Sequence, residues 1–240
     1  MQFFRQHLQM IALLAPLVAF FAFGSFIDYE SNVADGGVDG TAFLYLVMAR
    51  AIVMGLLIVG FWRIYLKDFS FQVDHWGLIV GIIGGAAWIG LCAIGLEQKT
   101  LTLLGLAPDL LGERSGVNPW KVYADTGTRD LFLCFRFSLL VVTVPIAEEL
   151  FLRGFFMRYI DATNWQELKL SEIGTAGLVA GTAYGVASHP SEIVAAAVWF
   201  SLVTWLMVRT DKFWNCVLAH AVTNLILGVY LCMTGNWHLW

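Results

Sequence analysis

Charged residues are scarce in this 240-residue sequence, and their scarcity excludes an ordinary soluble domain. Asp, Glu, Lys and Arg make up 13% of the chain, whereas hydrophobic residues make up 59%. A soluble domain carries about 25% charged and about 45–50% apolar residues. Both departures indicate that much of the surface faces a lipid bilayer. The formal net charge of −4 gives no basic footprint, so nucleic acid is not expected as a partner.

Cysteine is also rare, and its placement argues against a disulfide framework or a cysteine metal site. All four cysteines lie inside apolar runs and none belongs to a CxxC pair: Cys92, Cys134, Cys216 and Cys232. Cysteine is commonly a small buried hydrophobe, so we interpret the four as packing residues. The sequence also lacks repeats, low-complexity tracts and domain linkers, which favours one continuous helical bundle.

Long apolar runs are what the sequence does contain. A membrane-spanning helix needs roughly 20 mostly apolar residues. Seven segments qualify: 9–27, 42–62, 77–96, 130–158, 172–189, 191–208 and 213–233. We therefore predict an all-α, polytopic transmembrane bundle of about seven membrane helices, with eight as the alternative. The first segment is long for a signal peptide and no A-x-A-like cleavage site precedes the acidic stretch after Phe26, so we expect an uncleaved span.

The loop charges predict an orientation. Residues 28–41 carry four acidic residues and no Lys or Arg, so this loop should lie outside. Basic residues of the alternate loops fit the inside: Arg5, Arg63, Lys67, Arg158, Lys169, Arg209 and Lys212. The long segment 97–129 has mixed charge, and we expect it to be a polar loop outside the bundle. The 18 Phe and 10 Trp residues are expected at the membrane–water boundary, where aromatic rings gather.

Ionisable residues inside apolar spans are the most informative positions, because they are costly in lipid and tend to face the bundle interior. The predicted fourth helix contains Glu148, Glu149 and Arg153. Spacing of i,i+4 puts Glu149 and Arg153 on one face, close enough to pair. Glu148 is rotated about 100° away and has no partner on its own helix, which suits a general base. Alternatively, the helix ends here and all three charges lie in head-group water.

The predicted fifth helix ends in a histidine on a glycine face. Gly177, Gly181, Gly185 and His189 follow at four-residue steps, and small residues at this spacing let neighbouring helices approach closely. His189 therefore continues a face that packs against protein. The alternative is a helix-end histidine beside Pro190 that only interacts with the last carbonyls.

The predicted seventh helix carries a second polar stripe, formed by Cys216, His220, Asn224 and Gly228. His220 and Asn224 lie one turn apart and could both donate hydrogen bonds to one ligand oxygen. The alternative is an ordinary interhelical hydrogen bond, worth about 0.6 kcal/mol in a membrane.

Together these groups are sufficient for hydrolysis. They provide a base for water, a proton shuttle and donors for an oxyanion. We therefore expect Glu148, His189, His220 and Asn224 to converge on one cavity. The main rival function is a non-catalytic membrane scaffold or immunity-type protein of the same fold, which would tolerate the loss of Glu148. A transporter is disfavoured because no paired half-repeats or broken-helix pairs occur.

The order of these motifs resembles the CAAX prenyl protease type II family of intramembrane proteases, also called the CPBP or abortive-infection-domain family. The matching residues are Glu148-Glu149-Leu-Phe-Leu-Arg153, His189, and His220-Ala-Val-Thr-Asn224. The resemblance covers about residues 129–233. It divides the chain into N-terminal transmembrane helices with a polar loop at 1–128 and a protease core at 129–240, within one continuous bundle.

The sequence departs from the family pattern at one position and shows a second, narrower resemblance at its C-terminus. The family's second motif is usually F-x-x-x-H, whereas Gly185 stands four residues before His189 here, with Tyr184 one residue earlier. The C-terminal stretch HAVTNLILGVYLCMTGNWHLW also resembles a branch encoded beside exosortase sorting systems in Gram-negative bacteria.

The resemblance implies a role for each site residue. Glu148 would activate water with the help of His189, while His220 and Asn224 would stabilise the oxyanion. The supporting residues would be Glu149 and Arg153. The family has been described both as metalloproteases and as metal-free glutamate proteases. Glu148, His189 and His220 match a catalytic zinc set, yet the sequence has no HExxH and Asn224 is a poor zinc ligand, so hydrolysis without a cofactor is favoured.

The implied substrate is a membrane-anchored protein or peptide that is cut near its C-terminus. It would carry either a prenylated CAAX tail or a bacterial sorting tail, and the implied location is the bacterial inner membrane. The predicted helix boundaries raise one conflict, because they put His189 at the outer end of its helix and Glu148 and His220 in the inner halves of theirs. These residues can meet only if the fifth helix starts late, residues 159–171 dip into the membrane, or the fourth helix breaks near Pro145.

Overall fold

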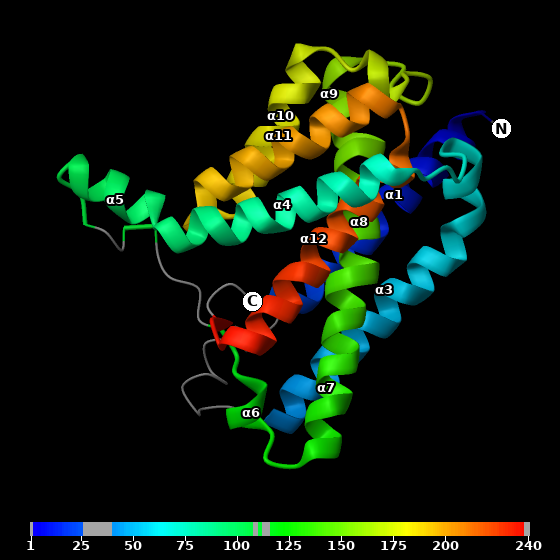
Figure 1. The fold of residues 1–240 in the computed structure, drawn as a ribbon. Helices are drawn as coiled ribbons and strands as arrows, with labels where there is room; N and C mark the ends of the chain where they lie inside the picture. Colours follow the sequence, from blue (N-terminus) through cyan, green and yellow to red (C-terminus); the bar gives the residue numbers. More distant parts are fainter. Residues whose placement is uncertain (1, 26–39, 108–109, 112–115, 238–240) are drawn as a thin grey trace. The chain divides into compact units, whose positions relative to one another are not determined.

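Helices form the regular structure of the described chain. The computed structural model describes residues 2–25, 40–107, 110–111 and 116–237, and no β-strand occurs within them. In its described part, each of the seven apolar segments is mostly helical (Figure 1), which confirms the all-α fold. The elements are α1 (Gln2–Ser25), α3 (Gly40–Asp68), α4 (His75–Ile94), α5 (Leu96–Leu103), α6 (Pro119–Val122), α7 (Thr126–Ser138), η1 (Leu139–Thr143), α8 (Val144–Phe151), η2 (Leu152–Phe156), α9 (Met157–Asp161), η3 (Leu170–Glu172), α10 (Thr175–Ser188), η4 (Pro190–Glu192), α11 (Ile193–Thr210) and α12 (Phe213–Thr234).

Six helical runs among the described residues are long and apolar enough to cross a membrane: His7–Gly24, Gly40–Asp68, His75–Ile94, Thr126–Asp161, Pro190–Thr210 and Phe213–Thr234. The protein is therefore an integral membrane protein, but the predicted count of seven spans is not confirmed. The exception is α10, whose 14 residues cover only about 21 Å at 1.5 Å per residue. The hydrocarbon core of a bilayer is about 30 Å thick. The start of α10 at Thr175 is also later than the predicted 172.

The segment 97–129 is not the plain polar loop that the sequence predicts. In its described part, α5 follows directly on α4, α6 forms a single turn, and α7 begins at Thr126. Glu97 is buried, and its carboxylate accepts the backbone N–H of Val194 at 2.9 Å. The start of this segment is therefore anchored to the N-terminus of α11.

The described cysteines are all free thiols, and they differ in exposure. Cys216 is fully buried, as a packing residue should be, whereas Cys134 is exposed. The packing interpretation is therefore wrong for Cys134, because an apolar helix in lipid also has an outward face.

Two compact units interleave along the chain. The first comprises residues 1–70, 115–151 and 228–240, and the second comprises 71–114 and 152–227. The core of the first unit is formed by buried apolar side chains from its helices and from the segment before α7: Leu17, Phe43, Leu44, Val47, Ala51, Met54, Val117, Tyr123, Phe132, Leu139, Ala147 and Leu231.

Polar side chains inside the first unit donate hydrogen bonds to backbone carbonyls. Pro16 lies within α1 and has no N–H, so the carbonyl of Ala12 loses its helical donor. The hydroxyl of Tyr65, a buried residue of α3, donates to that carbonyl at 2.7 Å. Arg50, also in α3, donates from Nε and Nη2 to the carbonyl of Phe20 and lies over the Phe20 ring, 3.9 Å from its centroid. These contacts offset the cost of an arginine within an apolar span.

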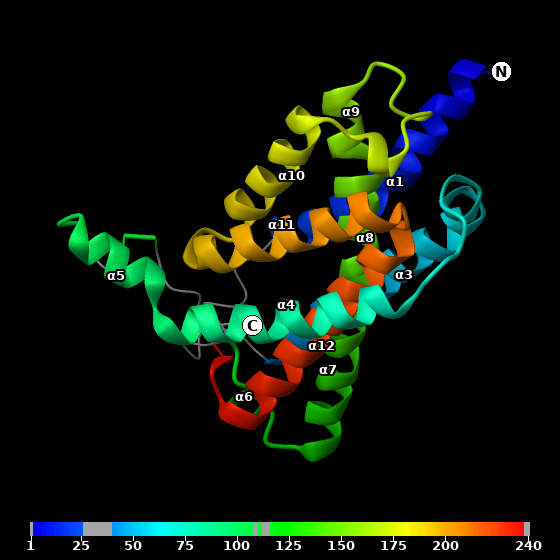
Figure 2. The same cartoon turned by 45° about the horizontal axis from the view of Figure 1, so that its top comes forward.

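In the second unit, α4 and α10 both pack against α11 (Figures 1 and 2). Glycines let α4 approach α12 closely as well. A Cβ on Gly81 would lie 2.7 Å from Cβ of Val222 and 2.8 Å from the carbonyl oxygen of Ala219. Both distances are shorter than real contacts allow, so this helix pair depends on a missing side chain.

The N-termini of α4 and α12 are joined by a polar cluster. Asp74 caps α4 by accepting the N–H of Trp76 at 3.0 Å, and its carboxylate also accepts from Nδ2 of Asn215 at 2.9 Å and Nζ of Lys212 at 2.8 Å. The amide oxygen of Asn215 in turn accepts a hydrogen bond from the backbone N–H of Asp74 at 2.9 Å. The Lys212 hydrogen bond, followed by those of Trp76 and Asn215, holds the pKa of Asp74 below its usual value.

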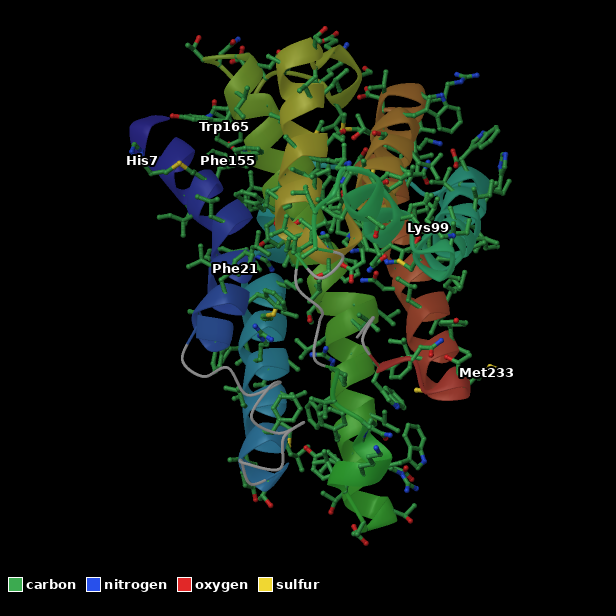
Figure 3. All side chains as sticks on the ribbon, turned by 90° about the vertical axis from the view of Figure 1, so that its left-hand side faces the viewer. His7, Phe21, Lys99, Phe155, Trp165 and Met233 are labelled. Atoms are coloured by element: carbon green, nitrogen blue, oxygen red, sulfur yellow. The ribbon has the colours of Figure 1, made fainter. Side chains whose placement is uncertain are left out.

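The connection from α9 to α10 is compact. Arg158 donates to the carbonyls of Leu168 at 2.9 Å and Gln166 at 2.7 Å. Trp165 is buried, and its ring packs edge-on against Phe155 with centroids 5.1 Å apart (Figure 3). Arg158 thus fixes the backbone of this connection, which uses residues that the sequence assigns to the start of the fifth helix.

Candidate active site

Glu148 and Glu149 lie in α8, in the middle of the helical run Thr126–Asp161. This run contains two π-helical segments, η1 before α8 and η2 after it. In η1 the N–H of Val144 donates to the carbonyl of Leu139, five residues back. The wider turn accommodates Pro145 without a break in the helix. Such π turns inside α-helices are frequent at functional sites.

The charged residues of this run are buried. Glu148 is 9% exposed, and Glu149 and Arg153 are 0% exposed. The helix continues to Asp161, so the alternative of a helix end in head-group water is wrong. Arg153 lies in the π-helical segment η2. Hydrogen bonds there join residues five apart, so the regular α-helical spacing on which the Glu149–Arg153 pair was predicted does not apply. That pair stays a prediction.

His189 ends α10 on the glycine face that the sequence predicts. Gly177, Gly181 and Gly185 are all buried. A Cβ on Gly177 would lie 2.5 Å from the carbonyl oxygen of Met157, and one on Gly181 would lie 2.7 Å from its sulfur. The prediction of a packed glycine face is confirmed.

The ring of His189 is oriented by its own helix end. Its Nδ1 lies 3.0 Å from the carbonyl oxygen of Gly185 and 3.0 Å from the hydroxyl of Ser188. A carbonyl can only accept, so the Gly185 contact is a hydrogen bond only if Nδ1 carries the proton. In the neutral ring Nε2 is then the basic nitrogen. This contact is the one that the alternative of a helix-end histidine describes, because Gly185 supplies one of the last carbonyls of α10. A catalytic role for His189 stays a prediction.

Phe200 occupies the space beside Gly185. A Cβ on Gly185 would lie 2.1 Å from Cδ2 of Phe200. The Phe200 ring lies 5.8 Å from the His189 ring, and the Trp88 ring meets His189 edge-on at 5.2 Å. The family pattern has a phenylalanine at the position of Gly185. Here a phenylalanine from α11 packs against the histidine.

His220 and Asn224 lie one turn apart on the unbroken helix α12. His220 is 5% exposed, so its ring is buried within the protein. It meets the ring of Trp199 edge-on, with centroids 4.7 Å apart. Asn224 is half-buried. The predicted i,i+4 stripe is therefore present as α-helix.

The second unit brings its two site histidines to one aromatic pair. Trp199 and Phe200 are neighbours on α11 with ring centroids 4.8 Å apart, and they contact His220 and His189 respectively. Sequence reasoning missed both aromatic residues. The late start of α10 is one of the conditions under which His189 could meet the other site residues, and the rings of α11 connect it to His220. Convergence of Glu148 with these residues stays a prediction.

The described residues contain no group of three or more His, Cys, Asp or Glu side chains arranged to hold a metal ion. His189 could offer only Nε2 to a metal, because Nδ1 faces the Gly185 carbonyl. The zinc set of Glu148, His189 and His220 stays an alternative prediction.

Residues 130–226 match the sequence model of a family described as type II CAAX prenyl endopeptidase Rce1-like. The chain carries a domain of this family. The Rce1-like domain includes all six site residues named from the sequence and also Trp199 and Phe200, whereas Trp88 lies outside it. No curated protein and no solved structure matches the chain. Rce1-like proteins are membrane proteases that act on membrane-associated proteins, which supports a protease.

Proposed function

We propose that this protein is an intramembrane endopeptidase that hydrolyses a peptide bond near the C-terminus of a membrane-anchored substrate, in a bacterial inner membrane. One observation carries the proposal. Glu148 is a buried carboxylate in the middle of a membrane-spanning helix, between two π turns and within the Rce1-like domain. A buried carboxylate at such a position is costly, and proton transfer is a reason to keep it there.

The proposed reaction begins with water bound at Glu148. The carboxylate accepts one proton as the water oxygen attacks the scissile carbonyl carbon. His220 and Asn224 donate hydrogen bonds to the resulting oxyanion. The C–N bond then breaks, and the leaving amine takes a proton from Glu148, with His189 as the shuttle. The basic Nε2 implied by the Gly185 contact suits His189 to receive and release that proton.

In this proposal Glu149 and Arg153 have a structural role. Both side chains are fully buried, and a buried carboxylate or guanidinium is stable only when its charge is balanced. Their role is to hold the region around Glu148 in shape. A change at Glu149 should therefore reduce stability as well as activity.

Hydrolysis without a metal is the version that the side chains favour. Asn224 is a good oxyanion donor and a poor zinc ligand. Purified enzyme should therefore stay active in the presence of chelators. Loss of activity that zinc restores would instead support the set Glu148, His189 and His220.

The substrate class follows from the family description, which names a prenylated CAAX tail, while a bacterial sorting tail is the alternative. The test compares the C-termini of membrane proteins in cells that carry the wild-type gene or Glu148→Gln. A matched control is Glu172→Gln, because the Glu172 side chain is 55% exposed. Uncut tails should accumulate only with Glu148→Gln, and their sequences identify the substrate. Identical C-termini in all three strains would favour a non-catalytic scaffold.

A further inference from the structure

The two site histidines of the second unit are connected by a line of aromatic contacts. His189 contacts Phe200 with ring centroids 5.8 Å apart, Phe200 contacts Trp199 at 4.8 Å, and Trp199 contacts His220 at 4.7 Å. Trp199 is 4% and Phe200 1% exposed. Their rings are therefore confined by protein, and each imidazole has one face or edge against a ring with little room to move.

Trp199 is held by a buried hydrogen bond to Thr223, which is itself hydrogen-bonded to the backbone of α4. Its indole Nε1 donates to the hydroxyl of Thr223 at 3.0 Å. That hydroxyl donates in turn to the carbonyl of Gly81 at 2.9 Å. The Thr223 hydroxyl thus accepts once and donates once, which is the full use of its proton. These two hydrogen bonds link α11, α12 and α4 beside His220.

The indole of Trp199 packs closely against a glycine of α4. A Cβ on Gly84 would lie 2.9 Å from Cδ1 and 3.0 Å from Nε1 of Trp199. The indole therefore lies directly on the backbone of α4, while its hydrogen bond sets its rotation. Thr223 is the third residue after His220 on α12, so the residue that anchors the indole is on the helix that carries the imidazole.

Phe200 has the corresponding place beside His189. Its ring lies where a side chain at position 185 would be, and Gly185 also supplies the carbonyl that faces Nδ1 of His189. The missing side chain at 185 thus lets one ring reach both the α10 backbone and the imidazole.

We propose that Trp199 and Phe200 are positioning residues, which hold the imidazoles of His220 and His189 in the orientation that hydrolysis requires. Thr223 acts through Trp199. The catalytic meaning of this proposal rests on the proposed function. A misplacement of a catalytic group by about 1 Å can cost about 10²-fold in rate, and we expect losses of about 10- to 100-fold in kcat.

The test uses variants that change the anchoring but keep the shape. Thr223→Val removes the hydroxyl at nearly constant volume, and Thr223→Ser restores it. Trp205→Phe is the matched control, because Trp205 is on the same helix but 47% exposed. Turnover is measured on a farnesylated peptide with a C-terminal Cys-a-a-X sequence. Thr223→Val should lower kcat with little change in KM and unfolding temperature, while Thr223→Ser and Trp205→Phe keep wild-type kcat.

A second set of variants asks whether Trp199 acts through His220. Trp199→Phe should lower kcat in the wild-type background. In the His220→Ala background it should have no further effect on the residual rate, because the group that it positions is gone. A further drop of the same size in both backgrounds would show an independent structural role and overturn the proposal.

A spectroscopic measurement decides the positioning without any turnover. The imidazole ¹H–¹⁵N signals of His220 are recorded for labelled protein in lipid nanodiscs. Thr223→Val should shift or broaden them, whereas Thr223→Ser and Trp205→Phe should leave them unchanged. Unchanged His220 signals in Thr223→Val overturn the proposal whatever the activity. A wild-type protein that leaves the peptide uncut counts against the proposed function for prenylated tails, and these signals still decide the positioning.

Discussion

Replacement of Gly177 by alanine should displace α10 and lower both stability and activity. A Cβ at this position would lie 2.5 Å from the carbonyl oxygen of Met157, which is a backbone atom and cannot rotate away. Ordinary van der Waals contact begins at 3.4 Å, so the two segments must separate by about 0.9 Å. Overpacking of this kind usually costs about 1–3 kcal/mol. Because α10 ends at His189, the imidazole moves with the helix, and turnover should fall by up to about 10²-fold.

The matched control is Gly90→Ala in α4. Gly90 is also helical, but nothing lies within 4 Å of the added Cβ. Alanine is favoured over glycine in a helix by about 1 kcal/mol, so this variant should be as stable as the wild type or more so. Thermal unfolding in detergent micelles and turnover are measured for both variants. A Gly177→Ala protein that unfolds at the Gly90→Ala temperature and keeps full turnover would refute the reasoning.

Three further predictions concern other polar groups. Because the Lys212 hydrogen bond holds the pKa of Asp74 below its usual value, the stabilisation from Asp74 is complete above about pH 4 and is lost as the pH falls through the lowered pKa. The unfolding temperature of the wild type should therefore decline more steeply than that of Asp74→Asn as the pH falls below about 4, and equal slopes would contradict this. Tyr65→Phe should cost about 0.5–1.5 kcal/mol, because it removes the donor to the α1 carbonyl freed by proline; an unchanged unfolding temperature would show that this bond adds no stability. Glu149→Gln should lower the unfolding temperature by more than Glu148→Gln does, since it removes a carboxylate assigned to balancing Arg153, and the reverse order would contradict the assigned roles.

The sequence predicts the helices well, because apolar length is the physical requirement for a membrane span. It also predicts the glycine face of α10, since a four-residue repeat of glycines has few uses other than close packing. The predicted count of seven spans is not confirmed, because α10 is apolar but short. Its predicted start lies in a connection whose path depends on Arg158 and its carbonyl partners, and no local pattern marks that arrangement.

The sequence points to the ionisable residues of the candidate site, whose roles stay predictions, and not to their surroundings. Glu148, His189 and His220 stand out because charge or polarity within apolar runs is rare. Trp199 and Phe200 do not stand out, since aromatic residues are common in membrane helices. Their importance comes from partners on α4, α10 and α12, which are known only from the tertiary structure. The position of Trp199 in the sequence does carry one indication of its role. It lies well inside a span and not at the membrane boundary, where tryptophan gathers. The π turns around α8 have no sequence signature that we can identify.

The central claim is that Glu148 activates water, and one measurement tests it most directly. The turnover of purified Glu148→Gln is compared with that of the wild type and Glu172→Gln, at saturating farnesylated peptide. The substitution keeps the shape and removes proton acceptance, so kcat should fall by about 10²–10⁴-fold, while the exposed control keeps its rate and both variants unfold cooperatively. A Glu148→Gln protein with wild-type turnover would contradict the account.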